Sequence, residues 1–301
     1  MAARSNVLPR FLRSAWRLAW HVQNARTREL TCRDGASAAP GVTAAGPLRL
    51  APLWPALNCA SLFGFVPMHA MTSTKQGVSA VEISRRLGVS YPTGWYLEKR
   101  LRHAMTEREG RYLLGEPNDA GAVPVVEADD VYLGGERNQG SGPAGKTAVI
   151  AAAERHVGGR MGHVAMKVVE GFSSSAVKAF REICIANGAL VHTDGLRAFM
   201  AFGEAGCSHQ RSVTGSKRPA RARGAPFFVV NTAIANLSTA LKATHKTISA
   251  KHANDYLGAF CWTTNRRRDM TGMVPALCRA ATTASRLTRR SVYAAQAVSL
   301  G

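Results

Sequence analysis

Two aspartates, Asp129 and Asp194, stand where the sequence predicts strands of a buried sheet. Asp129 lies in the middle of the strand-like run 123–133, and Asp194 stands at the end of the short buried strand predicted at 189–192. A carboxylate in such a sheet is costly unless it is paired or bound to a metal. On adjacent strands the two side chains could hold Mg²⁺ through oxygen ligands, and a pair of such ions can activate a nucleophile for attack on a phosphodiester. The alternative is that both residues form turns or caps.

The segments around these aspartates predict an α/β domain. Three strands come first, and helices then alternate with one further strand. The predicted strands are residues 123–133, 147–153, 162–169 and 189–192, and the predicted helices are residues 173–186, 196–202, 231–242 and 250–265. This order implies a mixed sheet flanked by helices.

A pair of helices is predicted upstream of this domain. Ser79 and Glu82 have the spacing of a capping box, which starts a helix, and Gly88 suits the left-handed turn that ends one. Ser90 can cap a second helix with Pro92 in its first turn. Two helices joined by a short glycine turn form the plan of a helix-turn-helix, although an ordinary helical hairpin has the same local pattern.

In a helix-turn-helix, the second helix enters the major groove of DNA. Tyr91, Thr93 and Gly94 would then face the edges of the bases. The basic residues expected to contact phosphates are Arg85, Arg86, Lys99, Arg100 and Arg102. The alternative for these basic side chains is a solvated face of an ordinary hairpin.

The composition of the chain favours the same kind of partner. Its 39 Lys and Arg against 19 Asp and Glu give a net charge of +20, which favours nucleic acid, unless the Arg content only reflects a GC-rich genome. The six Cys form no C-x-x-C pair, so we expect reduced thiols and no zinc site. Every apolar run of 18 residues is interrupted by a charge or another polar group, which predicts no membrane-spanning helix.

Four segments resemble, in their order and spacing, insertion-sequence transposases with a ribonuclease H-like catalytic domain. They are Glu127 to Gly135, His192 to Gly195, Val230 to Leu237 and Tyr256 to Arg267. The similarity continues into the helix pair and covers about residues 60–270. It implies a bacterial mobile-element protein that binds the ends of its insertion sequence and catalyses Mg-dependent DNA cleavage and strand transfer.

The resemblance also implies roles for single residues. Asp129, Asp194 and Asn231 would form the catalytic and metal-binding set of a DDE-type enzyme with Asn in the third position, using Mg²⁺ or Mn²⁺. Asn236 is the alternative third residue, and Asp130 would either assist the set or remain outside the direct ligands. A basic loop precedes Asn231 and would contact the DNA backbone, unless it is only a solvated linker. Its basic residues are Lys217, Arg218, Arg221 and Arg223. The expected partner is double-stranded DNA in the bacterial cytoplasm, associated with the nucleoid, with the chain assembling on it as a homo-oligomer.

The sequence departs from this family pattern at several positions. Such proteins commonly begin with a Cys-rich zinc ribbon, of which only Cys32 remains. Ser238 stands where the family has a basic residue, and Ala259 and Thr263 replace an acid and an Arg. The alternative function is therefore a catalytically decayed transposase relic that still binds DNA.

Residues 140–147 match the P-loop pattern and provide a third hypothesis, an NTPase in which Asp194 would be the Walker B acid. A P-loop directly follows a strand and opens a helix at its Lys, which is Lys146 here. The polar residues 134–139 interrupt this context. The preferred interpretation is a hairpin loop between the first two strands.

These predictions divide the chain into four parts. They are a poorly ordered or degenerate N-terminal region (1–60), a helix-turn-helix domain (61–115), a ribonuclease H-like catalytic domain (123–270) and a C-terminal tail (271–301). Residues 1–28, with six Arg and no acid, have a composition that an organellar transit peptide would share.

Overall fold

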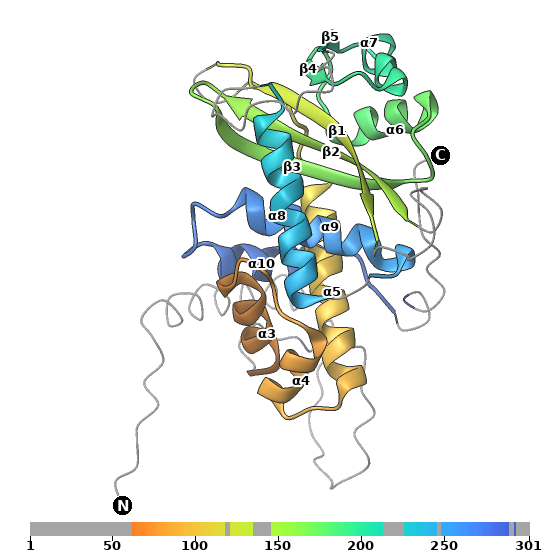
Figure 1. Cartoon of the computed structure of the whole chain (residues 1–301). Helices are drawn as coiled ribbons and strands as arrows, with labels where there is room; N and C mark the ends of the chain where they lie inside the picture. The colour runs from red at the N-terminus through yellow and green to blue at the C-terminus, as the bar shows by residue number, and fades with distance from the viewer. Residues whose placement is uncertain are drawn as a thin grey trace, which may run out of the picture.

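A computed structural model describes residues 62–117, 121–134, 146–212, 226–245 and 248–288, together with Val292. A β-sheet lies at one end of the molecule, and a group of helices lies at the other (Figure 1). Several predictions fall outside the described residues, namely those for residues 1–60, for 140–145 of the P-loop match, and for Lys217, Arg218, Arg221 and Arg223.

The sheet contains both antiparallel and parallel strands. Within the described residues its strands are β1 Val125–Leu133, β2 Thr147–His156, β3 Arg160–Val169, β4 Leu190–Thr193 and β5 Ser208–Arg211. They lie in the order β3-β2-β1-β4-β5. β2 pairs antiparallel with β1 and β3, whereas β4 runs parallel to β1 and β5. The predicted α/β fold with a mixed sheet is confirmed, and the short polar strand β5 is an addition that the sequence did not indicate.

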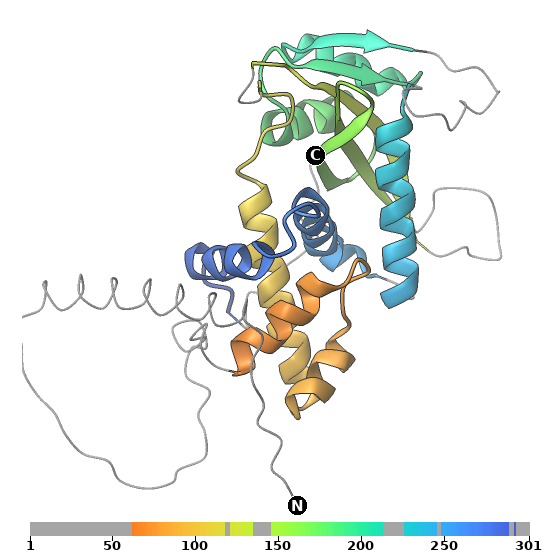
Figure 2. The same ribbon diagram turned by 90° about the vertical axis from the view of Figure 1, so that its left-hand side faces the viewer.

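Helices cover both faces of the sheet (Figure 1, Figure 2). Because alternate residues of a strand point to opposite faces, neighbouring residues of β2 enter different cores. Ile150 packs in a core with helix α6, Ser174–Cys184. Val149 packs in a second core with α8, Phe228–Thr244, and α9, Ala250–Asn265. Burial on both sides explains why β2 begins as a continuous apolar run. After β4 the chain forms two short helical segments, η1 Arg197–Met200 and α7 Ala201–Glu204.

The helical end of the molecule has a core of its own. It contains α3 Leu62–Ser73, α4 Ala80–Leu87, α5 Tyr91–Glu109 and α10 Met273–Thr283. Met68, Leu101 and Leu277, from three of these helices, are buried together. The prediction of a C-terminal tail is therefore corrected for residues 273–283, since α10 packs against α3 and α5.

Helix α9 joins the helical core to the sheet. Trp262 of α9 is buried in the helical core, whereas Leu257 and Cys261 are buried in the core beneath the sheet. A Cβ at Gly258 would overlap the Thr106 side chain, so glycine is required where α9 crosses α5. The helical part and the sheet are consequently packed onto each other by one shared helix rather than connected only through residues 110–124.

The predicted start and end of the first helix and the predicted start of the second are confirmed. The Ser79 hydroxyl accepts a hydrogen bond from the Glu82 amide at 3.3 Å and caps α4. Gly88 ends α4 with a φ of 64°, in the left-handed region. Ser90 occupies the N-cap position of α5, with Pro92 in the first turn, but its side chain makes no capping hydrogen bond to the backbone. Among the helices of the described ranges, none is long and apolar enough to cross a membrane.

The P-loop hypothesis is contradicted where its match ends. β2 begins at Thr147, which pairs with Leu133 of β1. A strand therefore follows Lys146 where a P-loop requires a helix. The segment connects two paired strands, as the hairpin interpretation predicted.

Candidate metal centre

Three carboxylates meet where β1 and β4 lie side by side. The parallel register pairs Ala128 with Thr193, so that the next residues, Asp129 and Asp194, are neighbours. One carboxylate oxygen from each of these residues and one from Asp130 all lie within 4.8 Å of one another. Among the described residues, this is the one group of three or more His, Cys, Asp or Glu side chains close enough to share a metal ion. The predicted pairing of Asp129 with Asp194 is thus observed, and Asp130 joins them.

Burial and repulsion from neighbouring carboxylates raise the pKa of both Asp129 and Asp130. Burial raises the pKa of Asp129 to about 7, and the neighbouring charges of Asp194 and Asp130 add to the shift. Burial and the charge of Asp194 also raise the pKa of Asp130. A cation among the three groups would remove this repulsion, because an opposite charge stabilises the ionised form of a carboxyl.

Local hydrogen bonds orient the cluster. The Asp130 amide donates to Asp129 Oδ1 at 2.9 Å, and the Leu196 amide donates to Asp194 Oδ1 at 3.0 Å. The Arg211 guanidinium, from β5, donates to the Gly195 carbonyl oxygen at 2.8 Å and braces the turn after Asp194. Sequence reasoning missed Arg211 because β5 has no apolar alternation that would identify a strand.

The donor set fits a hard divalent cation. All three groups supply carboxylate oxygens, which Mg²⁺, Mn²⁺ and Ca²⁺ prefer, whereas thiolate and imidazole are the usual ligands of zinc. The three groups are half-buried, so one side of the site stays open to a substrate.

The two asparagines proposed for the third position lie on different sides of α8. The sheet-facing side of this helix is defined by its buried residues, Val229, Val230, Ala233, Leu237 and Ala240. A helix turns by about 100° per residue. Asn231 is therefore directed away from the sheet, and its side chain is exposed. Asn236 lies at the border of the buried side and is half-buried.

Part of the predicted DNA-contacting surface is exposed at the junction of α4 and α5. Arg85 and Arg86, at the end of α4, and Tyr91, at the start of α5, are exposed, and Thr93 is half-buried. Gly94 instead packs against α4, because a Cβ at this position would lie 2.9 Å from the Ala80 carbonyl oxygen.

The other three predicted phosphate contacts are corrected by the structure. Lys99, Arg100 and Arg102 are only 6%, 3% and 6% exposed. Lys99 forms an ion pair with Asp255 of α9 and a hydrogen bond with His252. Arg100 lies over the Tyr96 ring, with its guanidinium carbon 5.3 Å from the ring centre. These cations belong to a helix interface and are not on a surface that DNA could reach.

Arg102 is the centre of this buried polar interface. It pairs with Glu98 one turn earlier, donates to His245 Nε2 at 3.2 Å and lies over the Tyr256 ring. Burial, and then the charge of Arg102, lower the pKa of His245 to about 4, so this imidazole is neutral and accepts the bond.

Comparison with known protein families identifies the sheet-containing part of the chain. Residues 120–265 match the model of a family described as an ISXO2-like transposase domain. The match contains the sheet, the three aspartates, α8 and α9, and it leaves α3 to α5 and α10 outside. The comparisons with curated proteins and with solved structures gave no significant match.

Proposed function

From the premise that residues 120–265 are an insertion-sequence transposase domain of the ISXO2-like family, we propose that the protein cleaves the ends of its element and joins them to target DNA. The five-stranded mixed sheet flanked by helices is compatible with a ribonuclease H-like transposase domain. The observation that carries the proposal is the cluster of Asp129, Asp130 and Asp194 at the junction of β1 and β4. Double-stranded DNA in the bacterial nucleoid is the proposed substrate, and a homo-oligomer assembled on it is the proposed active form.

Asp129 and Asp194 would hold Mg²⁺ or Mn²⁺, with Asp130 beside them. When bound, such ions would activate the attacking oxygen and stabilise the charge that develops on the phosphate. The chain itself supplies three carboxylates, of which Asp129 and Asp194 are oriented by backbone amides. A bound ion would favour the ionised form of Asp129, which would release its proton to solvent.

The experiment is cleavage of a terminal-repeat duplex, meaning a DNA duplex that carries the inverted repeats flanking the gene. The full chain should cut it with Mg²⁺ or Mn²⁺ and leave it intact with a chelator. DNA binding without metal-dependent cleavage would support the decayed relic, which the family departures at Ser238, Ala259 and Thr263 suggested.

We further propose that the α4–α5 junction binds DNA as a helix-turn-helix. Arg85, Arg86 and Tyr91 are exposed together at this junction, and the basic end of α4 precedes the capped start of α5. This arrangement would place the first turn of α5 in the major groove and the arginines near the phosphates.

Arg85→Ala should weaken binding to all duplex sequences alike and reduce the slope of log affinity against log salt by about one, because one phosphate contact is lost. Titrations of the full chain by fluorescence anisotropy at several salt concentrations measure this slope. Arg108→Ala is the matched control, since Arg108 is also exposed but lies in the last turn of α5. Equal slopes for both variants would place the DNA on another surface.

We also propose that Asn236, rather than Asn231, fills the third position of the metal site. The support is the half-buried location of Asn236 beside the sheet-facing side of α8. Asn236→Ala should slow single-turnover cleavage on the order of 10- to 100-fold, the usual cost of losing a supporting metal contact. Asn231→Ala, an equal truncation on the exposed side, should leave the rate nearly unchanged. The reverse order of effects would restore Asn231 as the third residue.

A further inference from the structure

Glu127 connects the strand of the metal centre to the start of α8. This glutamate is fully buried in β1, two residues before Asp129. Its Oε2 accepts hydrogen bonds from the backbone amides of Val229 at 3.0 Å and Val230 at 3.2 Å. The first turn of a helix has amides without partners inside the helix, and a side chain just before the helix usually accepts from them. Here the acceptor comes from a strand about a hundred residues earlier in the chain.

The residue that would normally provide this cap provides none. Phe227 precedes α8, and no side-chain cap bond is made there. It is buried and has a φ of 62°, a left-handed backbone conformation that is strained for an aromatic residue. The start of α8 is therefore held by contacts with the sheet rather than by its own sequence.

Electrostatics reinforce this contact. A carboxylate at the start of a helix is stabilised by the positive end of the helix dipole. The other oxygen of Glu127, Oε1, forms an ion pair with Arg155 Nε of β2 at 2.8 Å. The buried charge is thus compensated from two directions, and it attaches α8 to both β1 and β2.

We propose that Glu127 is a positioning residue, which attaches α8 to the strand that carries Asp129 and so holds Asn236 at the metal centre. Two short rigid segments connect these groups, Glu127 to Asp129 along β1 and Val230 to Asn236 along α8. Release of the helix start would let α8 shift along the sheet and would move Asn236 without touching an aspartate. The inference rests on the proposed function, because Asn236 is the proposed third residue.

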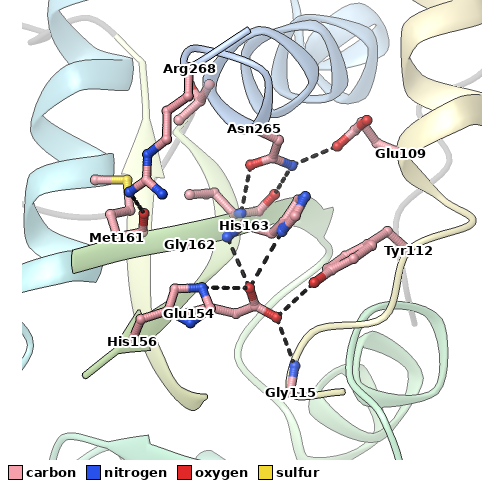
Figure 3. A network of polar contacts seen from close by, with 12 residues as sticks. Glu109, Tyr112, Gly115, Glu154, His156, Met161, Gly162, His163, Asn265 and Arg268 are labelled. Carbon is pink, nitrogen blue, oxygen red and sulfur yellow. Dashed lines mark hydrogen bonds and ion pairs between the residues drawn. The ribbon is translucent and has the colours of Figure 1, made fainter. Parts of the chain in front are cut away.

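A second buried glutamate offers a matched control. Glu154 of β2 is 1% exposed and accepts from the backbone amides of Gly115 and His163, both at 3.0 Å. It also accepts from the Tyr112 hydroxyl and lies beside the His156 and His163 rings (Figure 3). Its contacts hold the segment between α5 and β1, and none of these partners belongs to α8.

The first measurement is amide hydrogen exchange in the full chain. Glu127→Gln keeps the size of the side chain but removes its charge and the ion pair with Arg155. Exchange at Val229 and Val230 should become faster in this variant, whereas Glu154→Gln should instead affect Gly115 and His163. Unchanged protection of Val229 and Val230 in Glu127→Gln would overturn the proposal.

The second measurement is a double-mutant cycle in Mn²⁺ affinity and in cleavage rate. Glu127→Gln alone should lower both on the order of tenfold. Added to Asn236→Ala, it should lower them no further, because the residue that it positions is already absent. Multiplying effects would show that Glu127 acts only on the general stability of the fold and would overturn the proposal.

The two proposals can fail separately. A wild-type chain that binds Mn²⁺ but leaves the terminal-repeat duplex intact would refute the proposed function, while the exchange data and the Mn²⁺ cycle would still decide the role of Glu127. A wild-type chain that binds no Mn²⁺ would overturn both.

Discussion

Asp129→Asn and Asp194→Asn should each lower the rate of metal-dependent cleavage by at least about a thousandfold. A bound metal contributes several kcal/mol to stabilisation of the transition state, and about 1.4 kcal/mol corresponds to a factor of ten. Asparagine keeps the shape of the side chain but removes one negative charge from a cluster whose oxygens lie within 4.8 Å of one another. Affinity for the terminal-repeat duplex should persist in both variants, since the α4–α5 junction is unchanged.

Asp129→Asn should, in contrast, stabilise the folded protein when no metal is present. The pKa of Asp129 is about 7 in the folded protein, well above the ordinary value for aspartate. Between these two values the folded chain holds a proton that the unfolded chain has released, so wild-type stability falls as the pH rises through this window. Asp129→Asn removes this titration. Its melting temperature without metal should therefore exceed that of the wild type at pH 8, with a smaller difference at pH 5.

Melting curves with and without Mg²⁺ complete the test. Mg²⁺ should raise the melting temperature of the wild type by mass action and have little effect on either variant. Glu182→Gln, on the exposed surface of α6, is the control for loss of one negative charge and should retain both cleavage and the metal response. Full activity in Asp129→Asn or Asp194→Asn would show that the metal centre lies elsewhere.

Arg102→Ala should destabilise the protein by about 3 to 5 kcal/mol at pH 8, because it leaves the buried Glu98 carboxylate without its partner. Burial raises the pKa of Glu98 to about 7, against the lowering effect of Arg102. At pH 5 Glu98 is therefore already protonated in the wild type, and without Arg102 its pKa should rise further. The loss of stability should consequently be smaller at pH 5 than at pH 8, by up to about 1.4 kcal/mol for the one pH unit above 7.

Urea unfolding at the two pH values measures this effect. Arg85→Ala, which removes an exposed arginine from the neighbouring helix, should change stability by less than about 0.5 kcal/mol at either pH. If Arg102→Ala instead kept its stability and lost affinity for DNA, the original sequence-based assignment of Arg102 to the phosphates would be correct.

The outcomes for α4 and α5 show what local sequence can reveal. Ser79 and Gly88 were identifiable because capping and a left-handed turn depend on a few adjacent residues. The direction of Lys99 and Arg102 was not, since the partner of Lys99 is Asp255, 156 residues further along the chain. A basic residue on a helix looks the same in sequence whether it faces solvent or a buried carboxylate.

The residues of the metal centre were likewise only partly predictable from the sequence. Asp129 and Asp194 stood out because a carboxylate within or directly after an apolar strand needs a partner. Asp130 was placed beside the set but not in it, and its inclusion depends on how β1 and β4 approach each other. The proposed choice of Asn236 over Asn231 depends on which side of α8 faces the sheet, and the residues that pack there were not identifiable from local sequence.

By itself, the sequence determined the α/β class, the helix pair and the pairing of Asp129 with Asp194. Strand patterns, helix caps and acids in apolar strands can each be recognised from a few adjacent residues. The tertiary structure alone decided that α9 and α10 join the helical core, that three predicted phosphate contacts are buried, and that Glu127 holds the start of α8. These features depend on contacts between segments that are distant in the chain. Such contacts form only when two elements pack together, and they depend on whether the packed surfaces are complementary in shape and charge.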